Sequence, residues 1–441
     1  MGTVYRRAGP IVVFASLAIL AGRLFRLTHR YSVNIFLGDQ WEFHDADLFQ
    51  KHSLWEMFRW QFGPHRLGLG PLLSKLVEPS FSWNSRAESF ITCTVVTLAA
   101  LCAVWLKKRL FGRLSVYDIV IPVFYLSAIQ FESLFVFSNF AHGPLPLLLI
   151  TLYCLAWTAT GLFLRYVLVL ALNFVIIYTG FGVFLGLLTP PLLVFDYWSN
   201  LRMKPNGLLY FIAGLLVSCS SMASFFLGYT LQPAVHCFSL KPRSLHLYPA
   251  FVSLMYANFW ANADGLVPIA IGLVVVLWLI WTFVTTLRAM LKTNEIAWLR
   301  HAIPATLVSF SLMFAINAAY GRLCTGLESA QASRYANYLA LGIFGAYLNL
   351  FTLHSARLRN ALLSVAVVLS LTTLPIRARD RGTMRGFSDV KRKWKSCYLA
   401  GGSISECNAY ADFQIEPEPE PRLREKLEYL KRHRLNLYAG Q

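Results

Sequence analysis

Long apolar runs separated by short polar segments dominate the chain from residue 9 to residue 376. A helix that crosses a bilayer needs roughly 20 mostly apolar residues, and about eleven runs approach that length. The pattern therefore predicts an all-α polytopic membrane protein, with a transmembrane domain over residues 1–376 and a polar tail over residues 377–441. The expected spans are residues 9–28, 88–106, 116–132, 143–160, 164–180, 181–197, 207–227, 265–288, 302–320, 335–353 and 360–376.

Three local features refine this pattern. Gly180 and Gly182 lie between the fifth and sixth runs and predict a tight turn there. Residues 248–262 are aromatic but too short and polar to span, so we expect an interfacial segment. Residues 1–7 are basic and precede an apolar run without a clean small-residue cleavage site, which predicts an uncleaved membrane anchor.

Composition supports a membrane protein. Of the 441 residues, 56% are hydrophobic and 14% are charged, against roughly 25% charged in a typical globular protein. Mean hydropathy is +0.51. The net charge of +18 alone would suit a nucleic-acid binder, but the basic residues form short clusters between apolar runs. We therefore expect a lipid bilayer as partner, and no nucleic acid.

The distribution of Lys and Arg predicts the orientation. Basic clusters at residues 107–113, 202–204, 288–300 and 357–359 alternate with less basic loops, so the positive-inside rule places them and the N-terminus in the cytoplasm. The expected location is the bacterial inner membrane, with the endoplasmic reticulum as the alternative. Three polar segments then face outward: a large first loop over residues 29–87, residues 228–250, and the tail.

The tail contains features that point in different directions. Arginines directly after the last run would also suit the inner face, so the side of the tail stays open. Cys397 and Cys407 are either a disulfide formed in an oxidising compartment or two free thiols. Residues 416–421 read EPEPEP, an extended spacer, and residues 422–434 predict a short charged helix that forms a solvated cap. Four other cysteines lie in apolar runs and act as small hydrophobic residues: Cys93, Cys102, Cys154 and Cys219.

Acidic residues of the first loop are candidates for catalysis. Asp39 follows the first span directly, where partial desolvation raises the pKa of a carboxyl group and makes it a better base. The alternative is a loop-capping Asp beside an interfacial Trp41. Asp45 and Asp47 form a D-x-D pair that can hold a divalent metal ion against a phosphate, although on a helix these two positions point apart.

Basic residues in later segments are candidates for anion binding. His65 and Arg66 are adjacent and can bind an anionic headgroup, or else snorkel to the interface. Arg322 and Arg334 flank a loop of small residues that suits a polyprenyl phosphate, or Arg334 pairs with Glu132 or Glu328. The sequence contains no P-loop, dinucleotide-binding fingerprint or H-E-x-x-H motif, so ATP-driven transport and zinc proteolysis lack support.

Together these motifs resemble the GT-C superfamily of integral membrane glycosyltransferases, particularly its bacterial members. The G-D-Q-W segment at residues 38–41 resembles the family's catalytic acid after the first helix, which maps onto Asp39. The W-x-x-x-x-H-R stretch ending at Arg66 resembles a loop motif, and residues 130–132 resemble an acid-bearing second outer loop. A late S-R-Y element is similar to residues 333–335.

The resemblance implies a GT-C-like fold with a large outer cavity, a polyprenyl-phosphate-linked sugar as donor, and inversion at the anomeric carbon. The acceptor would be an envelope glycan, lipid or protein, and Asp39 would be the general base. Relatives often carry Asn-Glu where Gly63 and Pro64 stand, so a requirement for a divalent metal ion stays open. The implied substrate-binding residues are Gln40, Trp41, His65, Arg66, Glu132, Arg322, Arg334 and Tyr335.

Two other functions fit part of the pattern. A transporter or flippase of lipid-linked glycans would place charged residues and broken helices near the bilayer centre, where this chain has few charges. A non-catalytic membrane partner would fit the acid missing before His65. Turnover of a lipid-phosphate sugar by the purified protein separates the enzyme from both alternatives.

Overall fold

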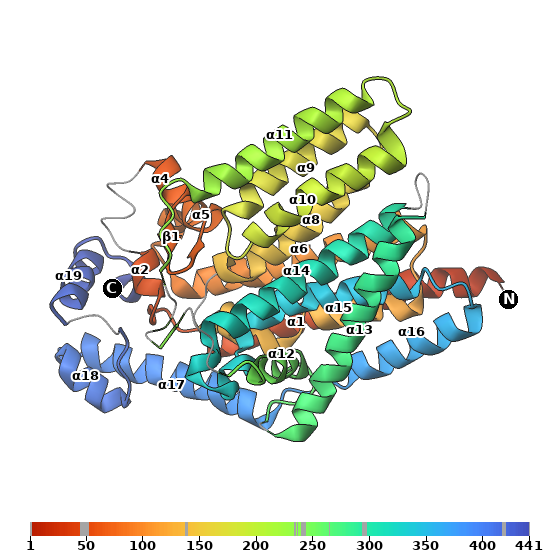
Figure 1. Cartoon of the computed structure of the whole chain (residues 1–441). Coiled ribbons are helices and arrows are strands. Elements are labelled where there is room, and N and C mark those ends of the chain that lie inside the picture. The colour runs from red at the N-terminus through yellow and green to blue at the C-terminus, as the bar shows by residue number, and fades with distance from the viewer. Residues whose placement is uncertain are drawn as a thin grey trace.

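The structure, a computed structural model, describes residues 2–44, 53–136, 140–232, 235, 237–239, 244–263, 265–292, 298–416 and 420–440. Helices dominate this part of the chain (Figure 1), in agreement with the predicted all-α class. Up to residue 157 the regular elements are α1 (Gly2–Tyr31), α2 (Gln40–Phe43), α4 (Leu54–Phe58), β1 (Gln61–Phe62), β2 (His65–Arg66), α5 (Leu69–Val77), α6 (Ser85–Phe111), α7 (Val120–Tyr125) and α8 (Pro144–Trp157).

The remaining helices follow the predicted apolar runs and then the tail. They are α9 (Leu162–Ile177), α10 (Val183–Asp196), α11 (Gly207–Phe226), α12 (Leu247–Ala257), α13 (Leu266–Met290), α14 (Leu299–Arg322), α15 (Ala336–Leu350), α16 (Ala356–Leu371), α17 (Ala378–Leu399), α18 (Ile404–Ala411) and α19 (Glu420–Arg432).

Five helices in the described chain are long and apolar enough to cross a membrane. Large apolar side chains are exposed along α9, α11, α13 and α16, a pattern that water disfavours and lipid accommodates. Five spans are supported by length and composition, and the count of eleven remains a prediction. The five are Ala8–Tyr31, Ser85–Phe111, Gly207–Phe226, Leu266–Met290 and Leu299–Thr325.

The third predicted span, residues 116–132, is not one helix. A 3-10 turn over Val116–Ile119 precedes the six-residue α7, and a second 3-10 turn covers Ala128–Gln130. The side chain of Gln130 donates to the carbonyl of Tyr125 at 2.7 Å, so a side chain satisfies a carbonyl that a continuous helix would bond internally. The run is therefore helical, but it is interrupted at residues 126 and 127, and whether it spans the membrane stays a prediction.

The predicted turn between the fifth and sixth runs is present. Helix α9 ends at Ile177 and α10 begins at Val183. Between them Gly180 has a φ of +61°, and its N–H donates to the carbonyl of Arg66 at 2.8 Å. Glycine adopts this left-handed conformation without the penalty of a Cβ, so the turn can pair with the β1–β2 hairpin.

The tail packs on the first loop, at the end of the bundle opposite the N-terminus (Figure 1). The N–H of Gly38 donates to the carbonyl of Ile415 at 3.0 Å, and the N–H of Asn436 donates to Ser82 at 2.8 Å. Helix α19 buries Leu423, Leu427 and Leu430. The expected solvated cap is therefore wrong in part, because α19 is amphipathic and one of its faces joins the core.

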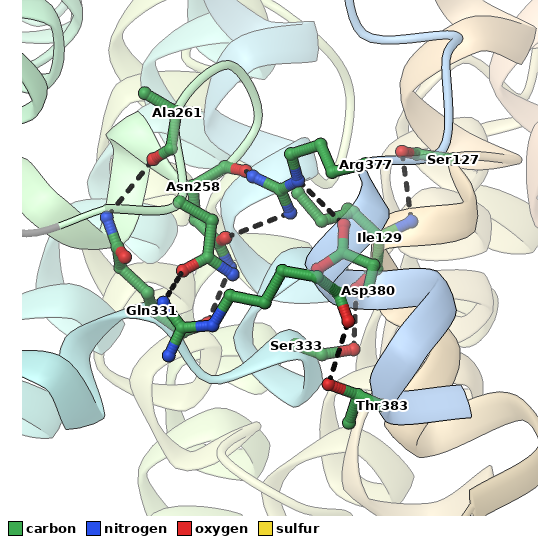
Figure 2. A network of polar contacts seen from close by, with 11 residues as sticks. Ser127, Ile129, Asn258, Ala261, Gln331, Ser333, Arg377, Asp380 and Thr383 are labelled. Carbon is green, nitrogen blue, oxygen red and sulfur yellow. Dashed lines mark hydrogen bonds and ion pairs between the residues drawn. The ribbon is translucent and has the colours of Figure 1, made fainter. Parts of the chain in front are cut away.

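A polar network fixes the start of the tail to the loops before α15 (Figure 2). Arg377 donates to the carbonyl of Asn258 at 2.7 Å and to Asp380 at 2.6 Å. Asn258 in turn donates to the carbonyl of Gln331 at 2.8 Å. This chain of bonds links α12 and α17 to the segment that carries Arg334.

Candidate functional site

Two adjoining cavities lie where the first loop, the end of α14 and the start of α15 meet. The smaller has a volume of about 200 Å³ and the larger about 400 Å³. Asp39, His142 and Arg334 line both. The predicted residues Gln40 and Glu132 line the smaller cavity only, and His65, Arg322 and Tyr335 line the larger. Segments more than 280 residues apart in sequence thus line one space, with charged and aromatic side chains around it.

Asp39 is positioned by the turn that follows α1. Gly38 has a φ of +54°, and its bond to Ile415 fixes this turn against the tail. Asp39 stands at the N-cap of α2, yet its side chain makes no capping hydrogen bond, so the loop-capping interpretation is not supported. Burial raises the pKa of Asp39, and the charges of Arg334 and Arg322 oppose that rise. A carboxylate that faces two cations while partly desolvated suits a general base.

Arg334 is held by the segment around Glu132. Its backbone N–H donates to Glu132 Oε2 at 3.2 Å, and its guanidinium lies 3.9 Å from the same oxygen. Ser333 Oγ donates to the carbonyl of Ile129 and accepts from the N–H of Glu132 at 3.0 Å. The predicted alternative, an ion pair between Arg334 and Glu132, is therefore present. The Arg334 side chain nevertheless stays 41% exposed and lines both cavities. Burial lowers the pKa of Arg334, but Tyr335, Glu132 and Asp39 together raise it above its ordinary value, so the residue is cationic.

A hairpin brings His65 to the larger cavity. Gln61 pairs with Arg66 and Phe62 with His65, which leaves Gly63 and Pro64 as a two-residue loop. Gly63 has a φ of +58°, as the first position of a type II′ turn requires. Gly63 and Pro64 therefore close the turn that orients His65.

His65 contacts a second histidine that sequence reasoning did not assign. His65 Nε2 lies 3.0 Å from His142 Nε2. Burial lowers the pKa of His65 to about 4, and the positive charge of Arg322 adds a smaller effect. Burial also lowers the pKa of His142, with smaller electrostatic effects from His65, Arg334 and Arg322. Both rings are therefore neutral at pH 7, and one donates its N–H to the lone pair of the other. Only its nearness to Glu132 along the chain could have indicated His142.

Three of the predicted substrate-binding residues, Arg66, Trp41 and Gln40, bond to or pack against other parts of the protein. Arg66 is 2% exposed, and its guanidinium donates to the backbone carbonyls of Arg59, Phe225 and Leu227, so it lines neither cavity. Trp41 is buried against Phe36 and is not interfacial. Gln40 borders the smaller cavity, but its side chain accepts from the N–H of Leu37 and donates to Glu88. The metal candidates Asp45 and Asp47 lie outside the described residues.

Four cysteines form two disulfides, and the other four are free thiols. Cys397 and Cys407 form a disulfide, one of the two alternatives left open above. Cys237 and Cys324 form another, which the sequence did not predict because 87 residues separate them. Cys324 follows Arg322 by two positions, so this disulfide fixes the loop beside the larger cavity. The four cysteines of the apolar helices are free thiols, as expected.

Comparison of the chain with known protein families, curated proteins and solved structures gave no match.

Proposed function

We propose that the protein is a membrane glycosyltransferase that transfers a sugar from a polyprenyl-phosphate donor to an acceptor hydroxyl on the outer face of the membrane. The observation that carries the proposal is the arrangement of Asp39, Arg322 and Arg334 around one cavity. A base opposite two cations is the arrangement that this reaction requires.

The proposed reaction divides the charges between these residues. The acceptor oxygen attacks the anomeric carbon as the bond from that carbon to the phosphate oxygen breaks, and the phosphate leaves with the bonding electrons. Asp39 takes the proton of the acceptor hydroxyl. Arg334 and Arg322 stabilise the charge that develops on the phosphate, and attack from the opposite side inverts the anomeric carbon.

Residues around the charged groups have separate roles in the proposal. The neutral His65–His142 pair supplies hydrogen bonds without adding positive charge beside Asp39. Phe181, Phe314 and Tyr338 line the larger cavity and offer apolar and aromatic surface to a sugar ring or prenyl chain. Glu132 orients Arg334 and does not touch the reacting atoms.

The two disulfides support the outward orientation. Disulfides persist in oxidising compartments and are rare in the cytosol. Cys324 adjoins the larger cavity, and the Cys397–Cys407 pair lies in the tail that packs on the first loop. A cavity on this side receives a lipid-linked sugar rather than a cytosolic nucleotide sugar.

The test is mass-spectrometric profiling of envelope glycans and glycolipids in cells expressing the wild type, no protein, or Asp39→Asn at matched membrane abundance. We expect a sugar increment with the wild type only, because loss of a general base lowers the rate by roughly 10²- to 10⁴-fold. Asp389→Asn is the control, since Asp389 is half exposed and pairs with Arg392 in the tail. An increment that survives Asp39→Asn but not deletion contradicts the mechanism and favours a transporter or scaffold.

A further inference from the structure

Three buried side chains behind the candidate site form a cluster that the proposed reaction does not use. His44, Glu78 and Glu88 are 5%, 6% and 5% exposed, and each offers a ligand atom within 4.8 Å of the others. His44 follows α2, Glu78 follows α5, and Glu88 lies in the first turns of α6. The cluster therefore joins three elements next to Asp39.

The hydrogen-bond partner of His44 Nδ1 fixes one of the ring protons. His44 Nδ1 lies 2.8 Å from the backbone carbonyl of Gln40, and a carbonyl oxygen only accepts, so Nδ1 carries the proton. A neutral His44 then presents the lone pair of Nε2, and Nε2 contacts Glu78 Oε2. Two lone pairs in contact repel unless a proton or a metal cation lies between them.

The surroundings match those of a metal-binding histidine. Metal-ligating histidines donate their other ring N–H to a carbonyl or carboxylate, which fixes the tautomer, and His44 does so. Its ring stacks on Phe36 with the centroids 4.0 Å apart, so its orientation is fixed. Glu88 Oε2 accepts from the amide of Gln40 at 3.2 Å. One residue thus supports two members of the cluster, as a second coordination shell does.

An unsatisfied atom adds an independent observation. Glu78 Oε1 is buried and has no hydrogen-bond partner among the described residues, and the Glu78 side chain is only 8% exposed. A buried carboxylate oxygen without a donor destabilises the folded state, because it has lost its hydrogen bonds to water. Coordination to a metal ion removes that penalty.

Lys391 does not bond to the cluster, although it lies close to it. Lys391 is buried and its charge acts on Glu88, but its ammonium donates to the carbonyl of Val136 at 2.6 Å. A divalent cation bound at the cluster would offset the charge of its carboxylates.

We propose that His44, Glu78 and Glu88 bind one divalent transition-metal ion, Zn²⁺ or Mn²⁺, through His44 Nε2 and a carboxylate oxygen of each glutamate. Imidazole and carboxylate are ligands that both ions accept. Coordination would hold α2, and with it the Asp39 turn, against α5 and α6. The three ligands do not include Asp45 or Asp47, and the site does not depend on the proposed function.

The test is the metal content of the full chain, purified in detergent without a polyhistidine tag and measured by inductively coupled plasma mass spectrometry. We expect about one equivalent of zinc or manganese per wild-type chain, at least a tenfold loss in Glu88→Gln and Glu78→Gln, and full content in Glu425→Gln. Glu425 is an exposed tail residue and controls for the loss of an acid.

A second measurement on the wild type covers the case in which the variants do not fold. After removal of metal with a chelator, the protein is titrated with Co²⁺, and we expect a visible absorption band that saturates at one equivalent and disappears on addition of Zn²⁺. A wild-type protein that contains less than about a tenth of an equivalent and binds neither Co²⁺, Zn²⁺ nor Mn²⁺ at micromolar concentration overturns the proposal. In that case a shared proton, not a metal ion, joins His44 and Glu78.

Discussion

The imidazole rings of His65 and His142 meet at their Nε2 atoms, 3.0 Å apart, although 77 residues separate them in the chain. His65 comes from the β1–β2 hairpin and His142 from the turn before α8. Both rings border the larger cavity. Their contact joins the first predicted outer loop to the second, and burial keeps both rings neutral.

The pKa of His65 predicts an acid-sensitive fold. In the unfolded chain a histidine takes up its proton below about pH 6.5, whereas the folded His65 does so only near pH 4. The unfolded state therefore binds more protons between these values, and stability falls as the pH falls through this window, by up to about 1.4 kcal/mol per pH unit. We expect a smaller drop in Tm between pH 7 and pH 5 in His65→Gln, measured by thermal unfolding in detergent. An unchanged slope would contradict the assignment.

The pH profile of transfer should report Asp39 and its cationic neighbours. Only the ionised carboxylate accepts a proton, so we expect activity to rise with pH through an inflection above the ordinary range of an aspartate. Arg334 lowers the pKa of Asp39, so Arg334→Gln should move this inflection to higher pH and lower kcat by about 10²-fold. The measurement is kcat against pH for both proteins, with Arg385→Gln as an exposed control. Coincident inflections would remove Asp39 as the base.

Arg66 should act on stability rather than on substrate binding. Its guanidinium donates to three backbone carbonyls, and hydrogen bonds to charged groups contribute about 1.5–3 kcal/mol each. Arg66→Met should destabilise the protein by about 4 kcal/mol or more, seen as a lower Tm, with KM for the lipid donor unchanged in the folded fraction. A raised KM at unchanged Tm would restore the headgroup-binding role.

Gly180 and Gly112 both have a positive φ, so alanine substitution at Gly112 is a control for the same substitution at the Gly180 turn. A Cβ on Gly180 would lie 2.6 Å from the hydroxyl of Tyr338 and 3.0 Å from the carbonyl of Ala141, whereas one on Gly112 would meet nothing within 4 Å. Their φ angles are +61° and +78°. We expect Gly112→Ala to lose about 1 kcal/mol for conformation and Gly180→Ala about 1–3 kcal/mol more for crowding. Equal Tm values would show that the turn is not closely packed.

Alkylation should separate the two classes of cysteine. Without reduction, the denatured protein should take up label at four thiols, and all eight cysteines should react after reduction. Cys397→Ser combined with Cys407→Ser opens a loop of 10 residues, which should lower stability by about 3 kcal/mol. Label at Cys324 without reduction would contradict the disulfide beside the larger cavity.

Local patterns in the sequence determined the helical class, the positions of the apolar segments and the turn at Gly180. Each of these depends on residues close together in the chain, because hydrophobic runs and glycine conformations act over one or two turns. The same reasoning selected Asp39, His65, Arg322 and Arg334, which the structure gathers around one cavity. It did not predict the break at residues 126 and 127, where the side chain of Gln130 donates to the carbonyl of Tyr125.

Packing between distant segments decided the rest. Arg66 turns away from the cavity because carbonyls at the end of α11, about 160 positions later, accept its hydrogen bonds. The Cys237–Cys324 disulfide, the His65–His142 contact and the His44–Glu78–Glu88 cluster likewise join separate elements. Residue spacing does not encode such contacts, since they form only when helices pack and bury their polar groups together.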